Sequence, residues 1–299
     1  DNTTGTVNTA MGRQSLQNNT TGSGNTAYGH NTLNTVTTAG CNTAVGGSAL
    51  FANTSGACNT AVGHSALVAN TTGGRNVALG FHALENNTTA GCNTAVGAQS
   101  LFTNTTGCFN AAVGLQALTA NTSGIDNVAM GYASMLANTT GDLNVGVGKF
   151  ALCNLTTGHG NVALGKLAGV NVFNVTTEDN RLILGHNSIS NAYVKVDWTV
   201  TSDERDKMNF EEVPHGLDFV NQLKPVSFVF KKSRENATPH GPQKYGFKAQ
   251  DILALEGDNN VIIDNENDEH LKVTNSHLIP VLVKAIQELK AEIDELKKK

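Results

Sequence analysis

A glycine recurs every 17 residues through more than half of the chain, and this period constrains the fold more than any other feature. The spacing holds from Gly12 to Gly165, and an asparagine four residues before each glycine keeps the same step from Asn8 to Asn161. The unit at 59–75, NTAVGHSALVANTTGGR, has a short alternating apolar segment, a glycine, a second small-apolar segment and an Asn-Thr-Thr-Gly turn. Ten such units run from about residue 8 to residue 177. This self-similarity predicts a solenoid of stacked coils.

Each unit is too small to fold alone. Its about four modest apolar side chains cannot bury a core, so burial must come from stacking unit on unit and chain on chain. The recurring asparagine is expected to form a ladder of amides along an inside corner, and glycine and asparagine tolerate the positive φ that sharp corners require. At about 4.8 Å per coil, the ten coils give a shaft of about 50 Å. The absence of proline from the units agrees with strands that cannot spare an N–H.

Charge divides the chain into two parts. Residues 1–178 carry four Lys or Arg and five Asp or Glu, whereas the other 121 residues carry 36 of the 45 charges and all five prolines. We therefore predict a mainly β repeat shaft at 1–178, built as a parallel β-roll or β-helix. A β connector should follow at 179–201, with strand-like segments at 181–185 and 192–200. A smaller α+β domain is expected at 202–299, ending in a helix at 276–299.

Composition argues against several partners and cofactors. The net charge of −5 gives no reason to expect nucleic acid or an anionic membrane, and no run of 18 apolar residues predicts membrane insertion. Without a CxxC spacing or an HxxxH-type histidine pair, neither a metal nor another cofactor is expected. Asn-x-Ser/Thr triplets fall at the turn of the repeat, so turn chemistry rather than glycosylation accounts for them. Free thiols are expected at all five cysteines, three of which share one repeat position: Cys41, Cys58, Cys92, Cys108 and Cys153.

The segment TSDERDKMNF, at 201–210, crowds two bases and three acids around a serine. A serine hydroxyl becomes a nucleophile when a neutral amine takes its proton, and burial can lower the pKa of a lysine enough for that. Ser202 and Lys207 are five residues apart, which would leave them about 140° apart on a helix, so their pairing requires a turn. The alternative interpretation is an N-cap serine followed by acids in a first helical turn.

SDERDKMNF resembles the start of the self-cleaving intramolecular chaperone domain at the C-termini of phage tail spikes, tail fibres and endosialidases. That domain opens with an S-D-x-R-x-K motif in which the serine and the lysine form a catalytic dyad. Ser202 and Lys207 fall on those positions, and Asp203, Arg205 and Asp206 also match. Two later segments resemble the same family, YGFKAQDI at 245–252 and VTNSHLIPVLVKAIQELKAEIDEL at 273–296.

The resemblance implies a serine-lysine autopeptidase that acts once, on its own chain. The domain would trimerise, direct folding of the fibre before it and then cut itself off at the junction Thr201, Ser202 and Asp203. We favour the Ser202–Asp203 bond, although the residues alone leave both bonds beside Ser202 open. Release would trap the folded shaft kinetically. A trimeric end would also set the register of three nearly uniform chains, because a shift by one repeat is almost isoenergetic.

The NTAVG-type units resemble the head repeats of trimeric bacterial adhesins and repeats in phage tail-fibre shafts, although the adhesin repeat is generally shorter than 17 residues. In the last segment, which begins at Leu278, a short heptad seam is formed by residues spaced 4-3-4-3: Leu282, Ile286, Leu289, Ile293 and Leu296. That pattern favours two strands by itself, yet the family resemblance implies three. We therefore expect a homotrimer with a C-terminal coiled-coil helix.

The preferred interpretation is a phage tail-fibre fragment, assembled in the host cytoplasm and carried in the virion. A host-surface glycan or receptor is a candidate partner, reached through the shaft or through parts before Asp1. The alternative is a bacterial adhesin head with a non-cleaving trimerisation cap. A glycan-degrading enzyme would need paired carboxylates in a cleft, and Glu85, Asp126 and Asp142 of the shaft are not repeated. Membrane-tethered transcription factors with a related domain are excluded by the repeats and by the absence of a basic DNA-binding domain.

Overall fold

The computed structural model describes residues 2–170, 174–186, 188–189, 193–195, 200, 202–231, 234–257, 260–266 and 268–299. It separates into two compact units, Asp1–Asn187 and Ser188–Lys299, each of which is described by itself. The predicted strand at 192–200 and the junction residue Thr201 lie largely or wholly outside the described residues.

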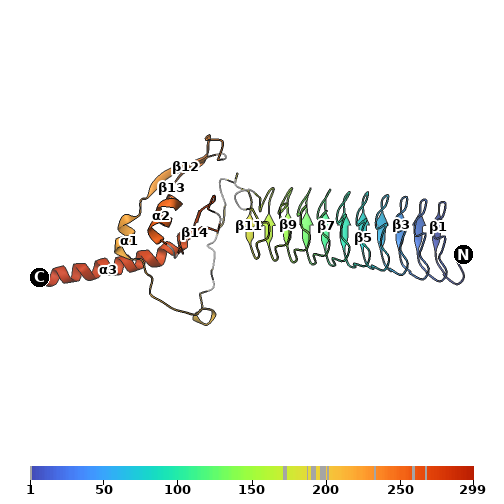
Figure 1. The fold of residues 1–299 in the computed structure, drawn as a ribbon, viewed down its shortest axis with the longest axis horizontal. Coiled ribbons are helices and arrows are strands. Elements are labelled where there is room, and N and C mark those ends of the chain that lie inside the picture. Colours follow the sequence, from blue (N-terminus) through green and yellow to red (C-terminus); the bar gives the residue numbers. More distant parts are fainter. Residues whose placement is uncertain are drawn as a thin grey trace. The chain divides into compact units, whose positions relative to one another are not determined.

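Three-residue strands form the first unit, one in each coil (Figure 1). They are β1 (Thr9–Met11), β2 (Thr26–Tyr28), β3 (Thr43–Val45), β4 (Thr60–Val62), β5 (Val77–Leu79), β6 (Thr94–Val96), β7 (Ala111–Val113), β8 (Val128–Met130), β9 (Val145–Val147), β10 (Val162–Leu164) and β11 (Leu182–Leu184). Within the described residues they make one 11-stranded sheet in sequence order. Neighbours are parallel and in register at the 17-residue step, as in Thr43↔Thr60, and the last step, Val162↔Leu182, is longer. The predicted solenoid is confirmed, and its first connector segment adds an eleventh rung.

Small residues fill the interior of the coils. From the coil of β2 to that of β7, the central alanine of the strand and the leucine of the second segment are fully buried, as at Ala61 and Leu67. Leu67 has φ 53°, in the left-handed region that costs a branched residue conformational energy. Its N–H donates to the Ala83 carbonyl of the next coil at 3.0 Å, so coil-to-coil pairing holds this conformation. The corner glycines are equally constrained, because a Cβ on Gly97 would lie 2.5 Å from the Gly114 oxygen.

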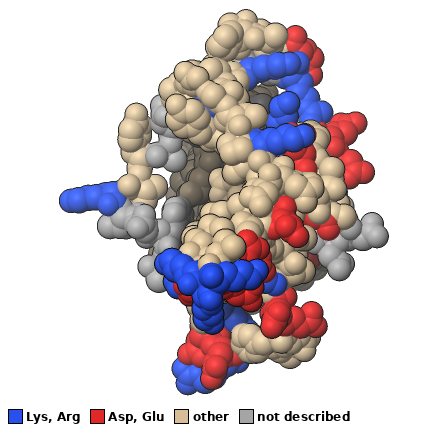
Figure 2. Space-filling view, turned by 90° about the vertical axis from the view of Figure 1, so that its left-hand side faces the viewer, with Lys and Arg blue, Asp and Glu red and all other residues tan. Residues whose placement is uncertain are grey.

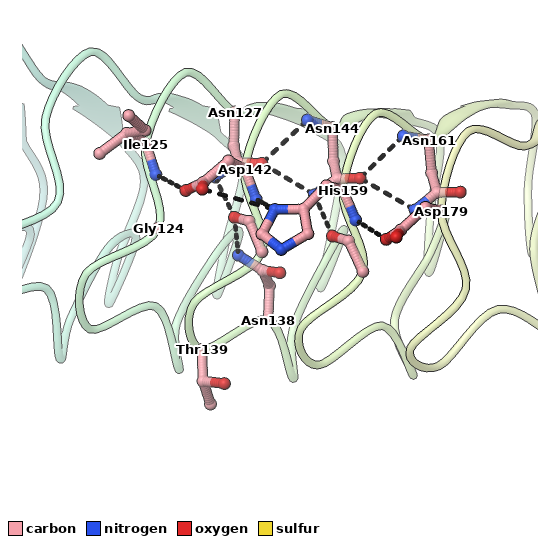
Figure 3. Close-up of polar contacts among 12 residues, drawn as sticks. Gly124, Ile125, Asn127, Asn138, Thr139, Asp142, Asn144, His159, Asn161 and Asp179 are labelled. Carbon is pink, nitrogen blue, oxygen red and sulfur yellow. Dashed lines mark hydrogen bonds and ion pairs between the residues drawn. The ribbon is translucent and has the colours of Figure 1, made fainter.

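Two asparagine ladders run through the stack, and Figure 3 shows part of the first, at Asn127, Asn144 and Asn161. In the first, the backbone N–H of each repeat asparagine donates to the side-chain oxygen of the previous one, as from Asn144 to Asn127 at 3.0 Å and from Asn161 to Asn144 at 2.9 Å. This is the predicted ladder. The second was not predicted, and it links the turn asparagines, as from Asn138 Nδ2 to Asn121 Oδ1 at 2.9 Å. These turn residues are fully buried, which fits their interpretation as turn chemistry.

One row of apolar side chains runs along the outer face of the sheet. The third residue of each strand points outward, and several are exposed, including Met11 at 58%, Tyr28 at 54% and Leu184 at 55%. We call this set the outer row: Met11, Tyr28, Val45, Val62, Leu79, Val96, Val113, Met130, Val147, Leu164 and Leu184. Contiguous apolar surface of this extent is rare on monomeric soluble proteins and marks an interaction face.

The second unit is a small α+β fold. It contains the 3₁₀ turn η2 (Glu204–Asp206), α1 (Leu217–Gln222), α2 (Ala249–Glu256), η3 (Asn275–His277) and α3 (Leu278–Lys298). Its antiparallel pairs are β12 (Val226–Lys231) with β13 (Pro239–Gly246) and β14 (Ile263–Asp264) with β15 (Lys272–Val273). Phe219, Ile252, Ile262, Ile263, Leu278 and Val281 form its core. The helix predicted at 276–299 is confirmed as α3.

Only the first part of α3 is packed within the chain. Leu278, Val281 and Ala285 are buried, whereas the predicted heptad seam is open: Leu282 42%, Ile286 66%, Leu289 45%, Ile293 38% and Leu296 68% exposed. Two carboxylates fix the neighbouring elements. Glu288 accepts the Leu217 N–H at 2.6 Å at the start of α1. The buried Glu256 accepts three successive backbone N–H groups of residues 261–263.

Candidate functional site

A single 3₁₀ turn shapes the segment around Ser202. Asp203 caps the turn, and its Oδ1 accepts the Arg205 N–H at 2.9 Å. The Arg205 side chain folds back on the same carboxylate, with Nε 2.9 Å from Oδ1 and 3.1 Å from Oδ2. This bonding by Arg205 lowers the pKa of Asp203 and raises that of Arg205. The Asp203 carboxylate therefore stabilises the turn.

The turn brings the two predicted catalytic residues together. Lys207 Nζ lies 2.7 Å from Ser202 Oγ and 3.4 Å from the Ser202 carbonyl oxygen. The Lys207 N–H also closes the turn on the Glu204 carbonyl at 3.1 Å. An ammonium donates to the hydroxyl in this geometry, and after losing a proton the amine can accept from it. The spacing of five residues thus works through a turn, as the sequence required.

The pair is open to solvent in the isolated chain. Ser202 and Lys207 are both exposed, and so are the apolar side chains that follow, Met208 at 80% and Phe210 at 71%. A lysine serves as a base at neutral pH when burial disfavours its charge. The single chain supplies the geometry of the pair but not that burial. The exposed apolar residues beside the pair form a surface that a neighbouring chain would cover in an assembly, and such a contact would bury the lysine.

The other two resembling segments lie at the core of the same unit. Residues 245–252 end β13 and begin α2, where Ile252 is 1% exposed. Residues 273–296 run through η3 into α3, where Val281 and Ala285 are buried. Tyr245, by contrast, is 89% exposed. The motifs therefore mix core positions with side chains that the single chain leaves uncovered.

Comparison with known proteins supports this domain. Residues 202–261 match the peptidase family described as the chaperone of endosialidase. The match begins at Ser202 and covers the turn, α1, the β12–β13 pair and α2. No curated protein and no solved structure matches the chain. The finding is thus a chaperone-type domain joined to a β-solenoid shaft.

Several of the few acids of the shaft make structural bonds. Asp142 Oδ1 accepts the Ile125 N–H at 2.7 Å, and the Asp142 N–H donates to His159 Nδ1 at 3.1 Å (Figure 3). Asp179 Oδ1 in turn accepts the His159 N–H at 2.7 Å. Each side chain caps a backbone group of the coil before it. Glu85 pairs with His82. This gives Asp142, Asp179 and Glu85 a structural role in the coils.

The remaining searches concern metals, membranes and charge. Among the described residues, no group of three or more His, Cys, Asp or Glu could hold a metal ion. Over that same part of the chain, no helix has the length and apolar character needed to span a membrane. All five cysteines are free thiols. On the face drawn in Figure 2, Lys and Arg lie interspersed with Asp and Glu, which does not favour nucleic acid as a ligand of that face.

Proposed function

We propose that the chain is part of a homotrimeric phage tail fibre whose C-terminal domain directs trimerisation and folding of the shaft and then releases itself by one self-cleavage beside Ser202. The observation that carries this proposal is the Ser202–Lys207 pair, 2.7 Å apart at the first residue of the chaperone-family match. The fibre would be assembled in the host cytoplasm and would recognise a host-surface receptor. A bacterial adhesin head with a non-cleaving cap is the second candidate, favoured only by the repeats.

Cleavage follows serine-lysine chemistry. The Ser202 hydroxyl attacks the carbonyl carbon of a flanking peptide bond while the neutral Lys207 amine takes the hydroxyl proton. The new O–C bond forms, the C–N bond breaks, and Lys207 returns the proton to the leaving amine. Water then hydrolyses the ester. The Lys207 ammonium near the Ser202 carbonyl oxygen, at 3.4 Å, favours the Ser202–Asp203 bond.

This mechanism depends on contact between neighbouring chains. A hydroxyl that attacks the carbonyl of its own residue would close a strained small ring, so cleavage of the Ser202–Asp203 bond calls for the hydroxyl of a neighbouring chain. A neighbouring chain would also cover Lys207 and favour its neutral form. Cleavage would therefore wait until the trimer has formed.

Two exposed apolar faces support the trimer. The outer row covers one side of the sheet in every coil, and the heptad seam of α3 is 38–68% exposed. A partner for the outer row must repeat apolar side chains at the coil spacing over eleven rungs, and copies of the same shaft meet that requirement. The register of such copies is weakly specified, since successive coils present nearly the same side chains. A separately folding trimeric domain would fix it.

Intact mass of freshly expressed protein tests the proposal. We expect the parent chain to appear as two fragments that meet beside Ser202, with their masses identifying the bond. Ser202→Ala and Lys207→Ala should stay whole, and so should Lys207→Arg, which keeps the charge but cannot act as a base. Lys224→Ala is the matched control, since Lys224 is an exposed lysine of the same unit, and it should be cut.

A parent chain that stays whole as a folded trimer would refute the enzyme proposal and leave the adhesin-type cap. Mixed trimers test the origin of the hydroxyl. Coexpressed Ser202→Ala and Lys207→Ala chains should show some cleavage if residues of two chains combine. They should show none if Ser202 and Lys207 must belong to the same chain, as in the pair of the single chain.

A further inference from the structure

One row of side chains along the shaft carries three of the four Lys and Arg residues of its repeats. It is formed by the residue directly after the corner glycine of each coil, and we call it the basic row: Arg13, His30, Gly47, His64, Phe81, Ala98, Leu115, Tyr132, Lys149, Lys166 and His186. No acid occurs among these eleven positions. Backbone bonds join successive positions, since the Phe150 N–H donates to the Tyr132 carbonyl and the Leu167 N–H to the Lys149 carbonyl, both at 2.9 Å.

The basic row is exposed and partly preorganised near its C-terminal end. Lys149 Nζ lies 5.3 Å from the ring centroids of both Tyr132 and Phe150, which are themselves 5.0 Å apart. The two rings hold the ammonium by cation–π attraction. Lys166 follows in the next coil and His186 in the one after it. Burial lowers the pKa of His186, and the nearby charge of Lys166 lowers it further, so Lys149 and Lys166 carry the positive charge at this end of the row.

A second aromatic group lies further toward the N-terminus on the same edge. Phe81 is 52% exposed and contacts His82, with ring centroids 3.8 Å apart. His64 stacks on Phe81 at 5.8 Å. Between the two groups, the neighbouring row presents amides, with Gln116 Nε2 bonded to Gln99 Oε1 at 3.1 Å. Flat rings, amides and isolated cations thus alternate along one edge.

The spacing and density of charge indicate the class of ligand. Coils repeat at about 4.8 Å, so the cations sit singly or in pairs between uncharged positions. Tight binding of DNA neutralises about 6–10 phosphates, more than three Lys and Arg can provide. Exposed rings flanked by hydrogen-bonding amides suit the apolar faces and hydroxyls of sugar rings. Cations beside them suit carboxylates borne by the same polymer.

We propose that the basic row binds an acidic polysaccharide, with sugar faces against Tyr132 and Phe81 and carboxylates against Lys149 and Lys166. In each coil, the corner glycine separates this row from the outer row that we assign to the trimer. The inference names the receptor class for the fibre proposed above and rests on that proposal for its biological role. The binding itself does not depend on cleavage.

Binding should be measured on the Ser202→Ala chain, which keeps the shaft attached whether or not the parent is cut. Calorimetric titrations would use oligogalacturonate as the acidic probe, dextran oligomers as the neutral one and oligothymidylate as a nucleic acid. We expect binding of oligogalacturonate that weakens with salt, and none of dextran. Lys149→Gln combined with Lys166→Gln should weaken it about tenfold, since each exposed charge pair contributes up to about 1 kcal/mol. Tyr132→Ala should weaken it several-fold.

Arg75→Gln is the matched control, because Arg75 is a shaft cation outside the basic row, and it should bind like the parent with unchanged thermal stability. Equal losses in Arg75→Gln and in the lysine variant would overturn the proposal, because general charge would then explain binding. Failure to bind oligogalacturonate, or tighter binding of oligothymidylate, would overturn it as well. Intact mass reports on self-cleavage separately, so either proposal can fail without the other.

Discussion

Replacing Asn93 by alanine should open the middle of the shaft. Asn93 is fully buried in the first ladder, where its Oδ1 accepts the Asn110 N–H at 2.9 Å and its Nδ2 donates to the Gly107 carbonyl at 2.8 Å. Alanine leaves the Asn110 N–H buried without an acceptor, which costs about 2 kcal/mol. The Gly107 carbonyl keeps its bond from Asn104, at 2.9 Å, so the second loss is only about 1 kcal/mol. The expected total is about 3 kcal/mol.

Hydrogen exchange of single amides is the suitable assay, because a repeat array need not unfold in one step. The Ala111 N–H is the reporter, since its acceptor, the Asn127 carbonyl at 2.8 Å, is untouched by the substitution. A loss of about 3 kcal/mol should speed its exchange by about a hundredfold. Asn86→Ala is the matched control. Its side chain makes one bond, to the Phe102 carbonyl, which the Asn86 N–H also reaches. Comparable exchange of Ala111 in the two variants would refute the ladder argument.

Three further predictions concern single carboxylates. Glu256→Gln should destabilise the second unit by about 2 kcal/mol in chemical denaturation, because three N–H groups lose a charged acceptor, whereas Asp251→Asn should be nearly neutral. Burial alone would raise the pKa of Glu178, but bonds from the N–H groups of residues 176 and 177 lower it overall. The ionised carboxylate therefore stabilises the folded shaft at pH values above the usual carboxyl range, and this stabilisation is lost as pH falls below that range. Exchange at the last coil should therefore differ between parent and Glu178→Gln at pH 7 but not in strong acid. Asp203→Asn keeps a capping residue but weakens the Arg205 contact, and mass spectrometry over time should show slower cleavage in an otherwise competent chain.

The period of the sequence was enough to predict the solenoid because residues 17 apart occupy equivalent places in successive coils. The short strands and the left-handed conformation of Leu67 were not predictable, since a leucine has no local preference for φ 53°. That conformation exists because the neighbouring coil accepts its N–H. Local sequence does not record such long-range bonds, so they become visible only in the folded stack.

The pairing of Ser202 with Lys207 was predictable from the sequence, but the contacts that hold the surrounding segments in place were not. Spacing required a turn between Ser202 and Lys207, and the structure contains one. The bonding of Asp203 by Arg205 depends on the shape of that turn, and the three-fold role of Glu256 depends on a loop that returns to the end of α2. Neither contact follows a helical or strand spacing. A search for acids near an S-D-x-R-x-K motif would have singled out Asp203, but nothing local signals Glu256.

The two ladders differ in the breaks that they tolerate, and the difference bears on the register of the proposed trimer. The first has no break from Asn8 to Asn161, because each amide oxygen takes a fixed backbone N–H of the next coil. In the second, Val36 and Leu155 replace asparagine, and a buried oxygen is left without a partner just before each break, at Asn19 and Asn138.

These breaks lie toward the two ends of the shaft. From Asn53 to Asn138 every coil repeats both ladders, and the outer row stays apolar from Val62 to Met130, so shafts displaced by one coil would again meet an apolar row over this central stretch. A shift by one repeat therefore changes few contacts there, and in the proposed trimer the information that aligns the chains must lie beyond the uniform coils. The second unit follows them in the chain and carries the chaperone-family match together with an exposed heptad seam. That arrangement supports a C-terminal domain that fixes the register before the shaft closes.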